Sequence, residues 1–309
     1  MIQSLLTGRR FFKEKEKKHM KKSYLKYILS LLIFGSNGIV ASYITLSSSE
    51  IVLSRTIIGS LFLGLVFIAG RKRLNLGQIK RQWFYLLGAG ISMGASWLFL
   101  FQGYQLVSIS TATLAYYCGP VLVIVVAPFL FQETMTASKI MGVVMVAFGM
   151  VFVNGSDFLA EGWSWGLVCG LLSALFYAGM IIFIKKVTEL SGLESTFIQL
   201  IIAGMVIAAY MLYVQHGVMD ISGKEIIPIL FLGIVNTGVA CYLYFSSMQA
   251  LPAQSVAICS YVDPLSALLF SAVILNEHLS LIQVVGASLV LGGAACSELY
   301  PFKKWNLKM

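Results

Sequence analysis

TATLAYYCGP, residues 111–120, and SVAICSYVDP, residues 255–264, decide the fold of this 309-residue chain. Each stretch lies inside a long apolar run, and in each a proline follows a tyrosine by three positions. A fixed shift of 144 residues separates the two stretches. Because a proline removes a backbone donor and loosens the preceding turn, Pro120 and Pro264 predict a helix break at the same place in two halves of the chain.

The composition around these stretches is that of a membrane protein. Hydrophobic residues make up 58% of the chain and charged residues only 11%, and the mean hydropathy is +0.86, whereas a soluble domain carries about 25% charged residues. Runs close to the ~20 residues that cross a ~30 Å hydrocarbon layer are present along the whole chain. We therefore expect an all-α integral membrane protein with ten transmembrane helices, at 24–44, 50–70, 83–106, 108–131, 136–154, 163–184, 195–215, 226–249, 252–275 and 279–297.

The shift of 144 residues extends over the whole chain without a gap. It matches Gly35 with Gly179, Glu50 with Glu194, Gly94 with Gly238, Phe101 with Phe245, Gln105 with Gln249, Tyr117 with Tyr261, Pro120 with Pro264, Glu133 with Glu277, Gly142 with Gly286 and Gly149 with Gly293. Five spans per half make the second half enter the membrane from the opposite side. The sequence thus predicts two inverted five-helix repeats, residues 23–155 and 156–300, around a site near the bilayer midplane, an arrangement used for alternating access.

Basic residues predict the orientation. They gather in the tail 1–22, in the connections that follow the second and sixth expected spans, and in the tail 301–309, whereas the opposite side holds only Lys224. Both tails are therefore expected in the cytoplasm, with the protein in the plasma (inner) membrane. The first twenty residues lack a long apolar core, so they are not expected to be a cleavable signal peptide.

Asp263 places a carboxylate near the middle of its expected span. A charge at the bilayer centre costs ~2.5–3.5 kcal/mol on insertion scales, which disfavours a lipid-facing position. Two interpretations stay open: Asp263 faces the cavity and contacts substrate or a proton, or it is protonated or hydrogen-bonded in a structural role. The candidate substrate-binding or coupling residues are Asp263, Tyr261, Tyr117, Tyr116, Trp97, Gln105, Asn37, Asn236 and Arg55, with Pro120 and Pro264 as helix breaks.

The last three spans also resemble a known family. From Tyr244 to Gly293, a stretch that begins YFSSMQALPAQSVAICSYVDP, the chain is similar to the EamA family of the drug/metabolite transporter superfamily. There an acidic residue often precedes a proline, as Asp263 does, and a short turn with a glutamate, here Glu277, joins the last two helices. FGSNGIVA resembles the family's opening, with Phe34 where tryptophan is frequent. The resemblance covers residues 24–297 and implies ten helices in two inverted repeats and transport of small organic metabolites, frequently export of amino acids or amines.

The charged residues within the expected spans narrow the class of solute that the protein can carry. A multiply anionic solute needs several intramembrane Lys or Arg, and Arg55 is the basic residue that lies well inside an expected span. A neutral, zwitterionic or singly charged solute fits better, with Trp97 and three tyrosines available for apolar or cation contacts. We expect a secondary transporter of an amino-acid or amine type of metabolite, exporting by alternating access. It needs no cofactor, metal or nucleic acid, protons are the candidate coupling ion, and the oligomeric state is open.

Other classes fit less well. An intramembrane protease needs paired aspartates or a serine with a histidine base, but Asp263 is the only aspartate within an expected span and both His216 and His278 stand at helix ends. A pump driven by ATP needs a GxxxxGK[ST] loop, which the chain lacks. The cysteines have no CxxC spacing and are interpreted as packing residues. An enzyme is therefore not expected, and the alternative is a channel or lipid flippase on the same bundle.

Overall fold

The computed structural model describes residues 20–71, 74–107, 109–161, 164–214, 221–274 and 280–299. Every regular element in those ranges is a helix, which confirms the all-α expectation. Eight helical segments there are long and apolar enough to cross a membrane, and Ala137–Phe152 and Leu281–Ser297 are shorter apolar helices at the two other expected spans. Ten full spans are thus not established. The two tails and Glu277 lie outside the described residues.

The helices follow the expected spans closely. The first half contains helix 20–35, α2 (Asn37–Ala41), α3 (Ser48–Ala69), α4 (Leu76–Leu106), α5 (Ile109–Tyr116), α6 (Cys118–Phe131) and α7 (Ala137–Glu161). The second half contains α8 (Trp165–Lys186), α9 (Gly192–Val214), the short η1 (Gly223–Glu225), α10 (Ile226–Phe231), the π-helix η2 (Leu232–Val239), α11 (Ala240–Met248), α12 (Ala253–Cys259), α13 (Val262–Ile274) and α14 (Leu281–Leu299).

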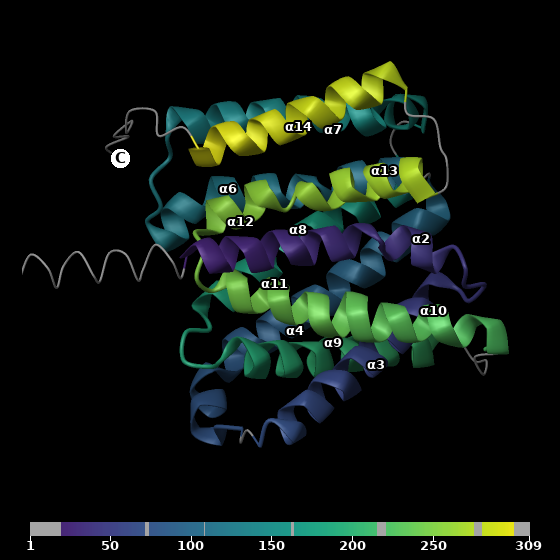
Figure 1. Ribbon diagram of the computed structural model, residues 1–309, viewed down its shortest axis with the longest axis vertical. Helices are drawn as coiled ribbons and strands as arrows, with labels where there is room; N and C mark the ends of the chain where they lie inside the picture. The colour runs from purple at the N-terminus through teal and green to yellow at the C-terminus, as the bar shows by residue number, and fades with distance from the viewer. Residues whose placement is uncertain are drawn as a thin grey trace, which may run out of the picture.

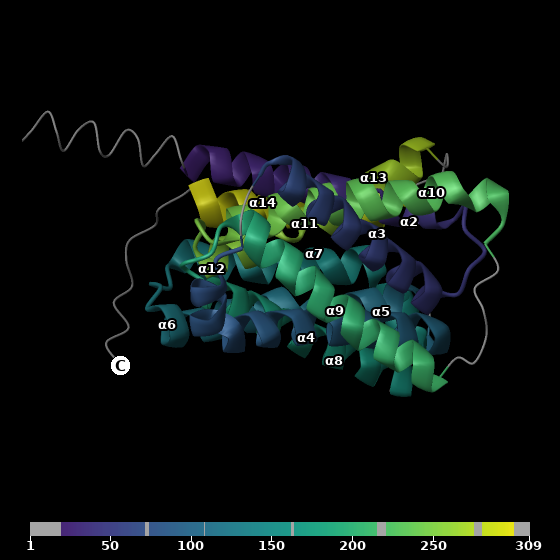
Figure 2. The same cartoon turned by 90° about the horizontal axis from the view of Figure 1, so that it is seen from below.

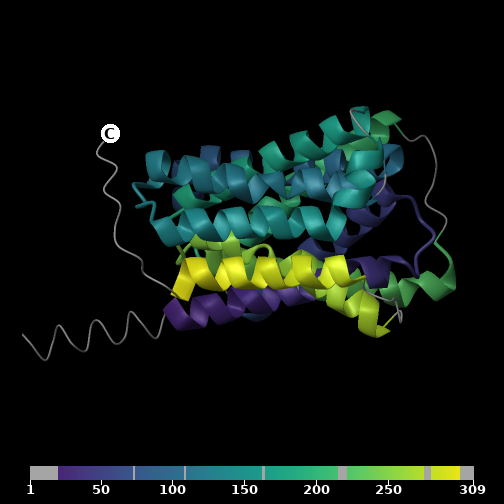
Figure 3. The ribbon, with the colours of Figure 1, turned by 90° about the horizontal axis from the view of Figure 1, so that it is seen from above.

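The helices form an elongated bundle with two distinct ends. Helix 20–35 begins and α14 ends at the same end, which we call the terminal end (Figure 3). The connection between α2 and α3 lies at the opposite, distal end (Figure 1). Seen from below, helix 20–35 and α10 to α13 form one layer, and α4, α5, α6 and α8 form the other (Figure 2). Residues of both halves therefore meet between the layers.

The repeat is visible in the helix caps. The backbone N–H of Ser47 donates to the Glu50 carboxylate (2.8 Å) at the start of α3. At the start of α9, the backbone N–H of Ser191 donates to the Glu194 carboxylate (3.0 Å). In both places the glutamate N–H in turn donates to the serine hydroxyl, which forms a capping box. The matched glutamates thus begin equivalent helices in the two halves.

The packing of α7 against α14 shows the relationship between the halves. A Cβ on Gly142 would lie 2.5 Å from the carbonyl oxygen of Gly293, and one on Gly149 would lie 2.6 Å from that of Gly286. Glycines permit this close approach of two backbones. Because Gly286 is the counterpart of Gly142 and Gly293 that of Gly149, the two contacts are equivalent under exchange of the halves. The helices run antiparallel, as an inverted repeat requires.

Candidate functional site

Two helix breaks meet in the middle of the bundle. The break between α5 and α6 falls at Tyr117, and the break between α12 and α13 falls at Ser260 and Tyr261, three or four residues before a proline in each case. The hydroxyl of Tyr261 donates a hydrogen bond of 2.7 Å to the backbone carbonyl of Tyr117. A carbonyl at the first break is therefore satisfied by a side chain from the second, which costs less than leaving it bare in an apolar interior.

A third break interrupts the first span. Helix 20–35 stops before Ser36, and the Asn236 amide donates to the carbonyl of Ile33 (2.8 Å) and to the Ser36 hydroxyl (2.9 Å). Asn236 is fully buried, and its Oδ1 and that of Asn37 have no hydrogen-bond partner among the described residues. Asn236 thus fastens the first-span break to the second half. Both asparagines lie at this break.

Arg55 is held inside the bundle by the other half. Its Nε donates to the Thr237 hydroxyl (2.8 Å), and its guanidinium lies 5.4 Å from the centre of the Trp97 ring. The hydroxyl of Thr237 donates to the carbonyl of Leu232, five residues earlier, across the wide turn of η2 (2.9 Å). π-helices often occur at functional sites. Arg55 is only 9% exposed, so it does not extend to the surface.

Asp263 lies half-buried in the first turn of α13. Its carboxylate has no hydrogen bond to the described residues, and it does not form a salt bridge with Arg55. The two charges nevertheless interact electrostatically. The Asp263 charge also acts on four tyrosine hydroxyls, those of Tyr104, Tyr116, Tyr117 and Tyr177. The site therefore combines one carboxylate and one guanidinium, held apart, with an aromatic surround.

The aromatic surround contains residues that the repeat pattern missed. Tyr116 packs edge-on against Tyr177 with ring centres 5.3 Å apart, and the hydroxyls of Tyr177 and Tyr244 share a hydrogen bond of 3.0 Å. Tyr27 stacks on Tyr244 at 5.0 Å. Their counterparts under the 144-residue shift are aliphatic, so matching the halves gave no signal for Tyr27, Tyr177 or Tyr244.

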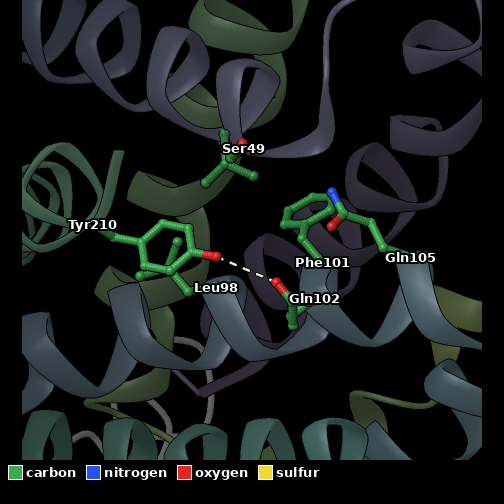
Figure 4. A pocket seen from close by; sticks show the side chains of 7 residues that line it. Ser49, Leu98, Phe101, Gln102, Gln105 and Tyr210 are labelled. Atoms are coloured by element: carbon green, nitrogen blue, oxygen red, sulfur yellow. Dashed lines mark hydrogen bonds between the residues drawn. The ribbon is translucent and has the colours of Figure 1, made fainter. Parts of the chain in front are cut away.

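Gln105 lies apart from this group. It lines a small cavity of about 20 Å³ at the distal end, between the start of α3 and the ends of α4 and α9 (Figure 4). Inside it, the Tyr210 hydroxyl donates to Gln102 Oε1 (3.2 Å). The volume suits about one water molecule. Among the predicted site residues, the structure thus groups Asp263, Arg55, Trp97 and the tyrosines, and separates Gln105.

The sequence matches a known protein family twice, once in each half of the chain. The pattern of the EamA-like transporter family matches residues 21–155 and, a second time, residues 164–298. The chain belongs to the EamA-like transporter family. Its two EamA units correspond to the halves whose capping boxes and glycine contacts are equivalent, so the resemblance seen in the sequence is confirmed. Membership identifies a multi-pass membrane transporter.

The chain is also similar to several known proteins. The chain is 27% identical over 282 residues to the uncharacterized transporter YxxF of Bacillus subtilis, an alignment that covers 90% of each protein. It is 25% identical over 205 residues to a WAT1-related chloroplastic protein of Arabidopsis thaliana, covering 62% of this chain and 49% of that one. A solved crystal structure superposes with a TM-score of 0.78 at 18% identity, covering 90% of this chain and 97% of the other. This likeness shows that the fold is shared.

Proposed function

We propose that this EamA-like protein is a secondary transporter that moves a small zwitterionic, neutral or singly charged metabolite of amino-acid or amine type by alternating access. The terminal end faces the cytoplasm of a plasma membrane, and export is the direction of net transport. The observation that carries the proposal is a pair of equivalent contacts, one at each end of the bundle. Each contact ties one half of the protein to the other.

The distal contact joins the connection before α3 to the start of η1 and α10. The Glu225 carboxylate accepts hydrogen bonds from the backbone N–H of Thr45 (2.5 Å) and from its hydroxyl (2.6 Å). The same carboxylate accepts from the backbone N–H of Ser222 (2.9 Å). We call this the distal latch. It closes the distal end between α2 and the second half.

The terminal contact joins the start of α4 to the connection before α9. Arg81 forms a salt bridge with Glu189. Next to it, Gln82 Nε2 donates to the Thr188 hydroxyl, and the backbone N–H of Glu189 donates to Gln82 Oε1, both at 3.3 Å. We call this the terminal latch.

The two latches are repeat counterparts. The shift of 144 residues places Thr45 on Glu189 and Arg81 on Glu225, so the same pair of positions closes opposite ends of the bundle. A carrier that opens to one side at a time needs two gates of this kind, related by its inverted repeat. A channel does not need two gates that are related in this way. The paired latches therefore support a carrier.

The charges between the latches support the solute class. Asp263 suits an ammonium group and Arg55 suits a carboxylate, since both have hydrogen-bonding capacity that the described residues do not use. A tyrosine surround can also contact a cation through ring faces. One positive and one negative side chain, held apart, match a solute that carries one charge of each sign.

The proposal is tested with the purified full-length chain. A thermal-shift screen against twenty standard amino acids and simple amines should reveal a binder, because a ligand stabilises the native state by RT ln(1 + [L]/Kd). In proteoliposomes, uptake of that binder should saturate and should be accelerated by unlabelled binder on the opposite side of the membrane. Absence of any binder, or flux that rises linearly with concentration beyond that of protein-free liposomes, would contradict a carrier.

One observation favours the second candidate, a lipid flippase. An apolar groove of about 260 Å³ runs between α3 and α9, lined by Leu53, Thr56, Ile57, Ser60, Leu61, Leu200, Ile201, Gly204, Met205 and Ala208. Such a groove suits a lipid acyl chain, but its lining contains no charged side chain for a headgroup. Movement of fluorescent phospholipid between leaflets of the same proteoliposomes, without saturable solute flux, would establish the flippase instead.

A further inference from the structure

Gln199 is a buried polar side chain in α9 with no part in the group around Asp263. It is fully buried, and its Oε1 has no hydrogen-bond partner among the described residues. The shift of 144 residues places it on Arg55. The second half therefore holds a neutral amide where the first half holds a guanidinium.

The two side chains also make equivalent contacts. Arg55 donates from Nε to the hydroxyl of Thr237. Gln199 donates from Nε2 to the sulfur of Met93 (3.6 Å), and Met93 is the counterpart of Thr237 under the same shift. Each residue is thus held against the other half of the protein at the same position. Gln199 therefore packs against the first half in the way that Arg55 packs against the second half.

The two residues lie at the same depth, Arg55 measured from the distal end of the bundle and Gln199 from the terminal end. Arg55 lies seven residues after Ser48, where α3 begins, and Gln199 lies seven residues after Gly192, where α9 begins. At a rise of 1.5 Å per residue each is about 10 Å from the start of its helix. Because α3 begins at the distal end and α9 at the terminal end, the two side chains flank the middle of the bundle.

Both side chains keep unused hydrogen-bonding capacity. A thioether is a weak acceptor, so the amide of Gln199 is poorly satisfied, and its carbonyl oxygen is not satisfied by the described residues. Leaving such a buried group unpaired destabilises the protein, because the group loses its hydrogen bonds to water and gains none in return. The terminal amino groups of Arg55 likewise have no hydrogen bond to the described chain. A ligand that reaches each residue in turn would use this capacity.

We propose that Gln199 is a specificity-determining residue that binds, when the site opens to the terminal end, the carboxylate that Arg55 binds when it opens to the distal end. The inference rests on the proposed function and adds that the affinity for the solute differs between the two sides of the membrane. Hydrogen bonds from a charged donor are about twice as strong as those from a neutral one. A carboxylate-bearing solute is therefore bound more tightly from the distal side than from the terminal side.

The first test measures sidedness by exchanging the two residues. The probes are the tightest-binding amino acid of the twenty-member panel and the amine that lacks its carboxylate. In oriented proteoliposomes, the apparent KM of the amino acid should be about fivefold lower from the distal side, and the amine should show no such difference. The double variant Arg55→Gln/Gln199→Arg should reverse the ratio. An unchanged ratio in a folded variant with saturable flux would overturn the inference alone, whereas no saturable flux in the unaltered protein would overturn the proposed function.

The second test combines a labelling measurement that needs no solute with a transport measurement on matched variants. Gln199→Cys should react with a membrane-impermeant maleimide only from the terminal side, and Arg55→Cys only from the distal side, against the background of the unaltered chain. Gln254→Met is the matched control for Gln199→Met, because Gln254 is also fully buried and donates to a methionine sulfur (3.4 Å), but its oxygen accepts from Lys139. Only Gln199→Met should abolish the difference in KM between sides. Labelling of the Gln199→Cys variant from neither side, or an equal effect of both methionine variants, would assign Gln199 to packing.

Discussion

The hydroxyl of Tyr261 donates a hydrogen bond to the backbone carbonyl of Tyr117, which is its own counterpart in the other half, 144 residues earlier. Two equivalent residues that touch each other lie next to the axis that relates the halves. The centres of the two tyrosine rings are 5.9 Å apart. The axis therefore passes beside both helix breaks, and the proline-containing spans are where the halves meet.

Tyr261→Phe should destabilise the protein by about 1 kcal/mol, because it removes the hydrogen bond to the freed carbonyl and leaves that carbonyl buried. Tyr117→Phe is the matched control, since the hydroxyl of Tyr117 has no hydrogen bond to the described residues. Thermal unfolding in one detergent should give a lower Tm for Tyr261→Phe than for Tyr117→Phe. Equal Tm values would mean that the bond does not hold the two breaks together.

Gly142→Ala should lower the stability through the contact between α7 and α14. The new methyl would lie 2.5 Å from the carbonyl of Gly293, so the helices must separate, and overpacking of this kind costs about 1–3 kcal/mol. Gly38→Ala is the control, because a Cβ there meets nothing within 4 Å. Both changes replace a glycine in a helix with alanine. A Tm for Gly142→Ala at or above that of Gly38→Ala would contradict the close approach.

The fold was largely predictable because apolar length and repeated polar positions survive in the sequence. Apolar runs located the helices, and the matched pair Glu50 and Glu194 proved to be equivalent capping residues. The π-helix was not predictable, since its wide turn depends on Thr237 bonding to a carbonyl five residues back and on Asn236 bonding to another helix. The separate position of Gln105 could not be predicted either. Helix periodicity indicates the helix face on which a residue lies, but it does not indicate which residues of the neighbouring helix lie opposite that face.

The orientation can be tested with reporters. A reporter fused after Lys308 should be cytoplasmic and one inserted beside Asp220 should be external, because basic residues gather on one side of the expected spans and favour the cytoplasm. A protease-protection assay of each fusion gives the side directly. Both reporters on one side would mean that the number of spans between them is even, and the inverted repeat would fail with it.

The distal latch should be stronger than the terminal one. Arg81 is 75% exposed, and exposed ion pairs contribute only ~0.2–1 kcal/mol, whereas the Glu225 carboxylate accepts several short hydrogen bonds. Glu225→Gln should therefore increase by about fivefold the rate at which Ser49→Cys, in the distal cavity, reacts with an impermeant maleimide. Arg81→Gln should leave that rate unchanged. If both substitutions increased it equally, the two contacts would not be gates for separate ends.

If Asp263 stays ionised and holds a substrate amine, Asp263→Asn should weaken binding of amine-bearing solutes at every pH between about 5 and 8. The expected loss is roughly tenfold, the equivalent of ~1.4 kcal/mol. The amide keeps the size and much of the hydrogen bonding but fixes the charge at zero, so only the attraction for an ammonium group is lost. Binding is measured by thermal shift with the best amine of the panel. A carboxylate solute without an amine is the control and should not lose affinity.

The same variant separates charge from proton coupling. If Asp263 carries a proton in exchange for solute, Asp263→Asn keeps solute exchange but loses accumulation driven by a pH gradient, because the amide cannot release a proton. Asp263→Glu retains the ionisable group and should restore that accumulation in part. Transport at the unaltered rate and affinity by a folded Asp263→Asn protein across the whole pH range would contradict both roles and leave the carboxylate with a structural one beside the α12 and α13 break.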